Sequence, residues 1–283
     1  MARTKGWTMR RTILVLLLCL LFLSPGTAAA QLLPIIDLHF HFADHGDIDV
    51  FVKQRDALGV AKAGNGARFA PDALALDWWR RYPDRFIPFA GKEAIRGFIS
   101  SHGERTLTLQ VPAVVAYIEQ LEAPLSTGQF KGIGEIRINF DSPLMRRLWS
   151  LSATYRVPLD VHMGAYDGPV AEMERLLASD RRGTLVWAHA GSYARPPLVR
   201  RLLRAHVNLY ADLSNRVFDM RNPEWKVLLE EFSDRFVLGT DTRSLPEFVD
   251  TIGSWREVLK QLSPTTARKL AHQNAERLLN LRR

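Results

Sequence analysis

The chain has 283 residues, a formal net charge of +8, 47% hydrophobic residues and a single cysteine. Four basic residues and no acidic residue lie in positions 1 to 30, so the rest of the chain carries a charge of only +4, which does not call for a nucleic-acid partner. The one cysteine, Cys19, also lies in this leader, which leaves the remainder without disulfides or a thiol nucleophile and leaves His, Asp and Glu to hold any metal ion.

The first thirty residues have the pattern of a secretory signal peptide. Basic residues precede an unbroken apolar run at 13–23, and the small residues Ala28 and Ala30 then fit a cleavage site before Gln31. This run is shorter than the about 20 residues that span a membrane. The sequence therefore predicts a signal peptide at 1–30 and a periplasmic or secreted product without membrane contact after cleavage. An uncleaved N-terminal anchor is the alternative.

From Pro34 onward, short apolar segments alternate with longer amphipathic ones, as in parallel strands separated by helices. The sequence predicts eight strands, at 34–40, 59–64, 85–91, 132–138, 157–162, 184–189, 207–213 and 235–241. Apolar residues that recur every three or four positions predict helices at 49–58, 71–82, 111–123, 143–155, 169–179, 196–205, 223–232 and 245–262. A last helix at 264–279 is expected to pack across the barrel.

These elements predict an α/β fold with one domain. Without the leader, residues 31–283 have the length of a (β/α)₈ TIM barrel, and a doubly wound open sheet is the structural alternative. Residues 91–109 follow the third strand without a clear helical period, and loops after barrel strands lie on the catalytic face. This segment is predicted to be a lid or substrate-binding loop, or else a surface excursion with a short helix.

Residues of metal-binding type stand at the carboxyl ends of five predicted strands: His39 and His41, Glu135, His162, His189 and Asp241. Alternate residues of a strand point to the same face about 7 Å apart, so the first two histidines would project together. Each residue alone has an ordinary explanation, such as a buried histidine bonded to backbone or a helix N-cap. A barrel has its catalytic residues at this end of its strands. The presence of metal-binding residues at five such ends therefore predicts a metal site.

The motifs DLHFH, GIGEI, VPLDVH, VWAHAG, VLGTD and NAERLL occur in order from Ile35 to Leu279, and RYPDRFIPFAG lies between the first two, at the third predicted strand. Together they resemble the amidohydrolase superfamily, in its amidohydrolase-2 type and the branch related to aminocarboxymuconate-semialdehyde decarboxylase. The resemblance implies a metal-dependent enzyme with one or two divalent ions, zinc before manganese, iron or cobalt. Barrels of this kind often pair, so the resemblance leaves open whether the chain forms a homodimer.

The resemblance assigns roles to the strand-end residues. It implies His39, His41 and His162 as metal ligands and Asp241 as a ligand and proton shuttle. In binuclear relatives the residue at Glu135 bridges two metals and His189 binds the second. In mononuclear relatives Glu135 need not bind metal, and His189 contacts the bound water or the substrate.

The expected activity is hydrolysis of a small-molecule ester, lactone, amide or phosphoester, because a bound zinc ion lowers the pKa of its water from about 15.7 to roughly 7. Asp241 would take the proton of that water and return it to the leaving group. Arg137 is a candidate for binding a substrate carboxylate or phosphate, or for pairing with an acidic neighbour, and Tyr166 and Tyr193 are expected to line the mouth. The alternatives are a metal-dependent decarboxylase or hydratase, and an exported binding or scaffold protein without turnover.

Overall fold

The computed structural model describes residues 32–41, 46–64, 72–103 and 109–281. The chain divides into two units, Met1–Leu33 and Pro34–Arg283, and all the helices and strands that are described lie in the second. The predicted signal peptide at 1–30 lies outside the described residues and stays a prediction, as do export and pairing into a homodimer. Within the described part, no helix combines the length and apolar character that crossing a membrane requires.

The second unit contains the predicted barrel of parallel strands. The described strands are β1 Ile35–Asp37, β2 Val60–Gly64, β3 Phe86–Ile87, β4 Phe89–Ala90, β5 Gly132–Ile136, β6 Pro158–Val161, β7 Thr184–Trp187, β8 Leu209–Asp212 and β9 Phe236–Val237. They pair in the orders β1-β2-β3 and β4 through β9. Strands β3 and β4 are one predicted strand that is divided at Pro88, whose nitrogen cannot donate to a ladder.

Backbone hydrogen bonds join the last strand to the first and close the ring. The amide of Leu38 donates to the carbonyl of Leu238 at 2.8 Å, and the amide of Asp241 donates to the carbonyl of His39 at 2.8 Å. A doubly wound open sheet would leave these edges unpaired. The closed barrel is therefore confirmed over the open sheet, with β3 and β4 counted as one of its eight strands.

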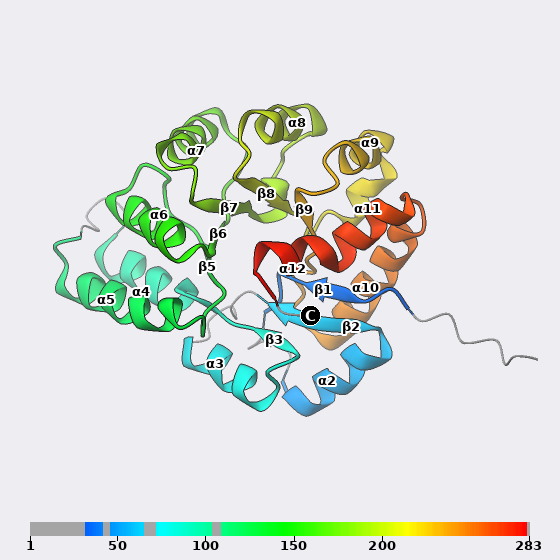
Figure 1. Cartoon of the computed structure of the whole chain (residues 1–283), viewed down its shortest axis with the longest axis horizontal. Helices are drawn as coiled ribbons and strands as arrows, with labels where there is room; N and C mark the ends of the chain where they lie inside the picture. The colour runs from blue at the N-terminus through cyan, green and yellow to red at the C-terminus, as the bar shows by residue number, and fades with distance from the viewer. Residues whose placement is uncertain (1–31, 42–45, 65–71, 104–108, 282–283) are drawn as a thin grey trace, which may run out of the picture. The chain divides into compact units, whose positions relative to one another are not determined.

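Helices surround the strands, as Figure 1 shows. They are α2 Ile48–Ala57, α3 Asp72–Arg81, α4 Lys92–His102, α5 Pro112–Ser126, α6 Pro143–Tyr155, α7 Asp167–Ser179, α8 Pro196–Ala205, α9 Pro223–Glu231, α10 Leu245–Leu259, α11 Pro264–Arg268 and α12 Asn274–Leu278, with short turns at Ala188–Ala190, Val217–Arg221 and Lys269–Gln273. Several begin with proline in the first turn, where its missing N–H costs no hydrogen bond. The Ser142 hydroxyl caps α6 by accepting from the amide of Met145 at 3.0 Å.

The segment after the third predicted strand differs from the expected loop. Most of it is the helix α4, which begins directly after Gly91 and buries Ile95 on its inner side. Ile95, Phe98 and Ile99 recur at helical spacing, but Gly97, Ser100 and Ser101 have low helix propensity, and this helix was not predicted from the sequence. The segment contains a short helix, as the second alternative expected. Its role as a lid or in substrate binding stays a prediction, and residues 104–108 lie outside the described part.

The C-terminal helical segment closes one end of the barrel. Asn274 is buried, and its Nδ2 donates to the carbonyls of Ser233 and Phe236 at 2.7 Å, at the start of β9. Ala275 and Leu279 join a buried cluster with the barrel residues Ile36, Leu38, Ile87, Phe89, Val186 and Val237. Figure 1 shows α12 lying across the barrel. The carboxyl ends of the strands, which carry the predicted site, are at the opposite end.

Candidate metal centre

The six strand-end residues predicted to bind metal come together in space. His39 and His41 follow β1, Glu135 lies in β5, His162 follows β6, His189 follows β7, and Asp241 follows β9. The ring centroid of His39 lies 5.5 Å from that of His41 and 5.0 Å from that of His189, and the rings of His162 and His189 are 4.6 Å apart. The predicted residues therefore share one site.

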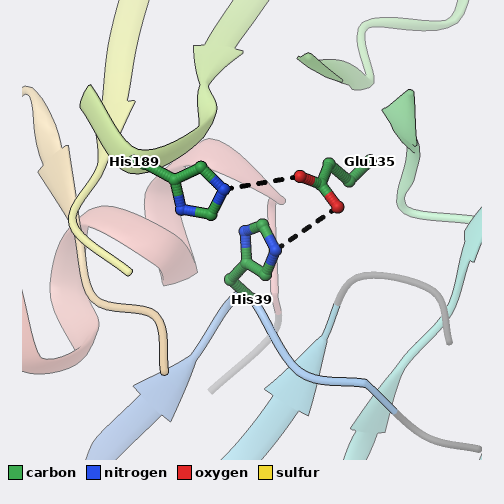
Figure 2. A group of neighbouring side chains, drawn as sticks. All are labelled: His39, Glu135 and His189. Carbon is green, nitrogen blue, oxygen red and sulfur yellow. Dashed lines mark ion pairs between the residues drawn. The ribbon is translucent and has the colours of Figure 1, made fainter. Parts of the chain in front are cut away.

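Their donor atoms form two groups that Glu135 connects. In the first group, His39 Nε2 lies 3.5 Å from Asp241 Oδ1, which also contacts His41 Nε2. In the second, Glu135 Oε1 lies 2.7 Å from His162 Nδ1 and 3.6 Å from His189 Nε2. The other oxygen of Glu135, Oε2, is 3.5 Å from His39 Nε2. Figure 2 shows the Glu135 carboxylate facing both His39 and His189.

The imidazole of His39 fits a metal ion better than it fits a hydrogen-bonded core. Its side chain is buried, and within the described part of the chain its Nε2 has no hydrogen-bond partner. This atom lies 3.5 Å from an oxygen of Glu135 and 3.5 Å from an oxygen of Asp241. Two ligands of one tetrahedral ion, each at about 2.1 Å, are about 3.4 Å apart. The donor set and its spacing therefore suit a divalent metal ion.

Asp212, the last residue of β8, orients His39. Its Oδ2 lies 2.7 Å from His39 Nδ1, and its Oδ1 accepts from the amide of Ser214 at 2.6 Å. Because a carboxylate can only accept, Nδ1 carries the proton and the lone pair of Nε2 faces the site. The Ser214 hydroxyl lies 2.7 Å from His189 Nδ1 and holds that ring as well. Such carboxylate–histidine pairs orient ligands in metal sites.

Burial and charge put four of the site residues, His41, His162, Glu135 and Asp241, in the protonation states that bind a metal. Burial lowers the pKa of His41 to about 4, although Asp241 opposes this, and burial also lowers the pKa of His162. For Asp241 and Glu135, burial would raise the pKa, but the surrounding histidines hold both values well below the usual range. Neutral imidazoles and ionised carboxylates are the forms that coordinate metal ions. For His39, burial would lower the pKa, but the carboxylates of Asp212 and Glu135 raise it, so a metal ion would have to displace a proton there.

Two residues of the site, Lys92 and Asp212, escaped the sequence analysis. Lys92 is the first residue of α4, and its Nζ lies 2.6 Å from Glu135 Oε2 and 3.4 Å from His41 Nδ1. Both residues stand at or directly after the carboxyl end of a predicted strand. The histidines were identified by searching the carboxyl ends of predicted strands. The same search would have found Lys92 and Asp212 if it had included a lysine after the third strand and a carboxylate in the seventh.

We expect Asp212→Asn to lower the affinity for zinc by roughly 10- to 100-fold. Each oxygen of Asp212 accepts a hydrogen bond, one from His39 Nδ1 and one from the amide of Ser214, whereas asparagine has a single acceptor oxygen. Either the Ser214 amide loses its acceptor, or His39 changes to the tautomer that carries its proton on Nε2, where it blocks the metal. Competition with a chromogenic chelator measures the affinity. The control is Asp180→Asn, which alters a carboxylate paired with the exposed Arg182 at 2.7 Å. Unchanged zinc affinity in Asp212→Asn would contradict the orienting role.

The site opens into a pocket of about 430 Å³, lined by His41, Lys92, Arg96, Ile99, Ser100, Glu135, Arg137, His162, Asp241 and Arg243. Arg137 lies in it as predicted, and its Nη2 is 2.8 Å from Nε2 of His162 rather than beside an acidic neighbour. Tyr166 and Tyr193 do not belong to this lining; their rings lie 6.2 Å apart, are 59% and 80% exposed, and Tyr193 borders a different cavity. Their role in substrate binding stays a prediction.

Solved structures with the same fold cover most of this chain. An uncharacterized TIM-barrel protein from Bordetella bronchiseptica is 17% identical, with a TM-score of 0.65 over 88% of this chain and 99% of its own. A dihydroxybenzoic acid decarboxylase from Polaromonas with bound manganese is 12% identical (TM-score 0.61; 88% and 97% covered). An amidohydrolase from Burkholderia multivorans with bound zinc is 15% identical (TM-score 0.61; 88% and 99% covered). These likenesses establish the TIM-barrel fold.

The family is shown by sequence. No curated protein sequence matches the chain, but a family model described as amidohydrolase matches residues 36–281. This match and the donor set of the site indicate an enzyme that depends on a divalent metal. Because the match extends over nearly the whole barrel and includes every residue of the metal centre, the chain belongs to the amidohydrolase family.

Proposed function

We propose that this enzyme is a hydrolase that holds two divalent metal ions, zinc before manganese, iron or cobalt, and acts on a small-molecule ester, lactone, amide or phosphoester. The position of Glu135 carries the proposal. One of its oxygens faces His39 and the other faces His162 and His189, at distances of 3.5, 2.7 and 3.6 Å. A carboxylate that faces two groups of donors suits a pair of cations that share it as a ligand.

Metal ions held in this way lower the pKa of a coordinated water to about 7 and polarise the carbonyl or phosphoryl oxygen of the substrate. Asp241 is placed to move the proton. Its Oδ1 faces His39 and His41, while its Oδ2 accepts from Asn215 Nδ2 and lies 3.9 Å from His189 Nε2. Because the histidines keep the pKa of Asp241 low, the carboxylate is ionised and can accept a proton and then return it to the leaving group.

A metal-dependent decarboxylase or hydratase is the second candidate, and the contact of Lys92 favours it. The Nζ of Lys92 lies 2.6 Å from Glu135 Oε2, so an ammonium group already provides the carboxylate with a positive partner. In this version His39, His41, His162 and Asp241 would hold a single ion, and His189 would contact the substrate. The Polaromonas enzyme is a decarboxylase with the same fold.

Hydrolysis and CO₂ release distinguish the two candidates. We expect the metal-loaded protein to hydrolyse at least one of 4-nitrophenyl acetate, dihydrocoumarin and bis(4-nitrophenyl) phosphate, and a chelator to lower that rate at least 100-fold until zinc or manganese is restored. The same preparation should release no CO₂ from 2,6-dihydroxybenzoate. Release of CO₂ together with no hydrolysis of the three esters would replace the hydrolase by the decarboxylase.

A further inference from the structure

The pocket above the metal centre is lined by an excess of positive charge. Among the described residues that line it, four are basic, namely Lys92, Arg96, Arg137 and Arg243, and two are carboxylates, Glu135 and Asp241. Both carboxylates point at the histidines of the metal centre. Bound metal ions would add further positive charge at the base of the pocket.

Two of these basic side chains, Arg137 and Arg243, have no carboxylate partner in the described structure. Arg137 is exposed, and its guanidinium contacts the ring nitrogens of His162 at 2.8 and 3.1 Å. Arg243 is exposed, and its backbone amide, not its guanidinium, donates to Glu247 Oε2 at 2.8 Å. Arg96 differs, because it pairs with Glu93 at 2.8 Å.

The arginines of the outer helix α8 are arranged differently. On α8, Arg200 and Arg204 reach Glu231 at 2.8 and 2.5 Å, and Arg201 reaches Glu174 at 2.7 Å. Arginines on this outer helix therefore find acidic partners. The two arginines at the metal pocket face a volume of about 430 Å³ instead.

We infer that the substrate carries a carboxylate or phosphate group next to the bond that is hydrolysed, and that Arg137 and Arg243 bind this group. This inference rests on the proposed hydrolase and names its substrate class. A planar guanidinium binds either anion through two parallel hydrogen bonds, and a pocket with a positive field raises the local concentration of anions. Arg137 follows Glu135 by two residues, so the anionic group would sit within a few ångströms of the metal centre.

A matched pair of esters tests the assignment on the metal-loaded protein. The probes are 4-nitrophenyl acetate, which is neutral, and the 4-nitrophenyl monoester of succinic acid, which is an anion. We expect the wild type to prefer the succinate ester, and Arg243→Gln or Arg137→Gln to lower the ratio of the two kcat/KM values at least 10-fold. The control Arg181→Gln alters an exposed arginine ahead of β7, at the other end of the barrel, and should leave the ratio unchanged. An equal ratio in wild type and variants would overturn the inference.

Direct binding keeps this test separate from that of the hydrolase. Calorimetric titration with isophthalate and with inorganic phosphate, at equal metal content per chain, should show at least 10-fold weaker binding to Arg243→Gln than to wild type for one of the two anions. The anion that shows the loss identifies the group as carboxylate or phosphate. If neither ester is hydrolysed but the loss is seen, the anion site stands, and the hydrolase proposal then depends on the hydrolysis of dihydrocoumarin or bis(4-nitrophenyl) phosphate. Equal binding of both anions to wild type and variant overturns the anion site.

Discussion

Replacing Asp241 with Asn is expected to lower kcat about 10³-fold while the protein stays folded, because an amide cannot accept the proton of the attacking water. The substitution preserves the local structure. The amide of residue 241 still donates to the carbonyl of His39 at 2.8 Å and closes the barrel. Asp241 has a positive φ of 54°, a conformation that asparagine adopts as readily as aspartate. The measurement is kcat on the best ester, with metal content determined on the same sample.

Metal content decides how a loss of activity in Asp241→Asn is interpreted. A variant that keeps the metal content of the wild type but loses turnover supports the proton shuttle. A variant that loses metal shows that Asp241 acts chiefly as a ligand, and full activity would contradict the shuttle. The control is Asp84→Asn, which removes an exposed carboxylate before β3, at the other end of the barrel, and should retain wild-type kcat.

The second large effect concerns the number of metal ions. We expect two ions per chain in the wild type and one or fewer in Glu135→Gln, with kcat at least 10³-fold lower. The variant keeps the size of the side chain but removes the negative charge that both donor groups face. Elemental analysis after dialysis against trace zinc gives the stoichiometry. Glu119→Gln removes an exposed carboxylate on α5 and serves as the control.

One ion in both wild type and Glu135→Gln would contradict the two-metal site. Glu135 would then serve as the partner of Lys92, at 2.6 Å, and His189 would act on the substrate instead of the metal. That outcome would favour the decarboxylase. Two ions in both proteins would equally contradict the role of Glu135, because its charge would then not be needed to hold the second ion.

The strand ends could be predicted from sequence because they depend on local patterns. Alternation places His39 and His41 on one face, and short apolar runs mark the strands that end at His162, His189 and Asp241. Since parallel strands of a barrel end on one face, the convergence of these residues follows from the fold. No long-range contact had to be known in advance.

Lys92 and Asp212 also stand at ends of predicted strands, but their roles could not be assigned from the sequence because these roles depend on contacts between distant parts of the chain. Asp212 lies 173 positions after His39, and a buried aspartate at a strand end also occurs in turns. Lys92 begins a helix that was not predicted from the sequence, so its contact with Glu135 was not expected either. The contacts of both residues are determined by tertiary packing, which a single sequence does not show.

The closure of the barrel by α12 determines the path by which substrate and products enter and leave the enzyme. With Ala275 and Leu279 packed into the far end, substrate and products must use the opening at the metal centre. Hydrolysis of an ester, lactone or amide creates a new carboxylate, and this product has to leave past Arg137 and Arg243. In the proposed hydrolase, the positive charge that attracts the substrate would also bind the product acid, so this acid would compete with the substrate as it accumulates.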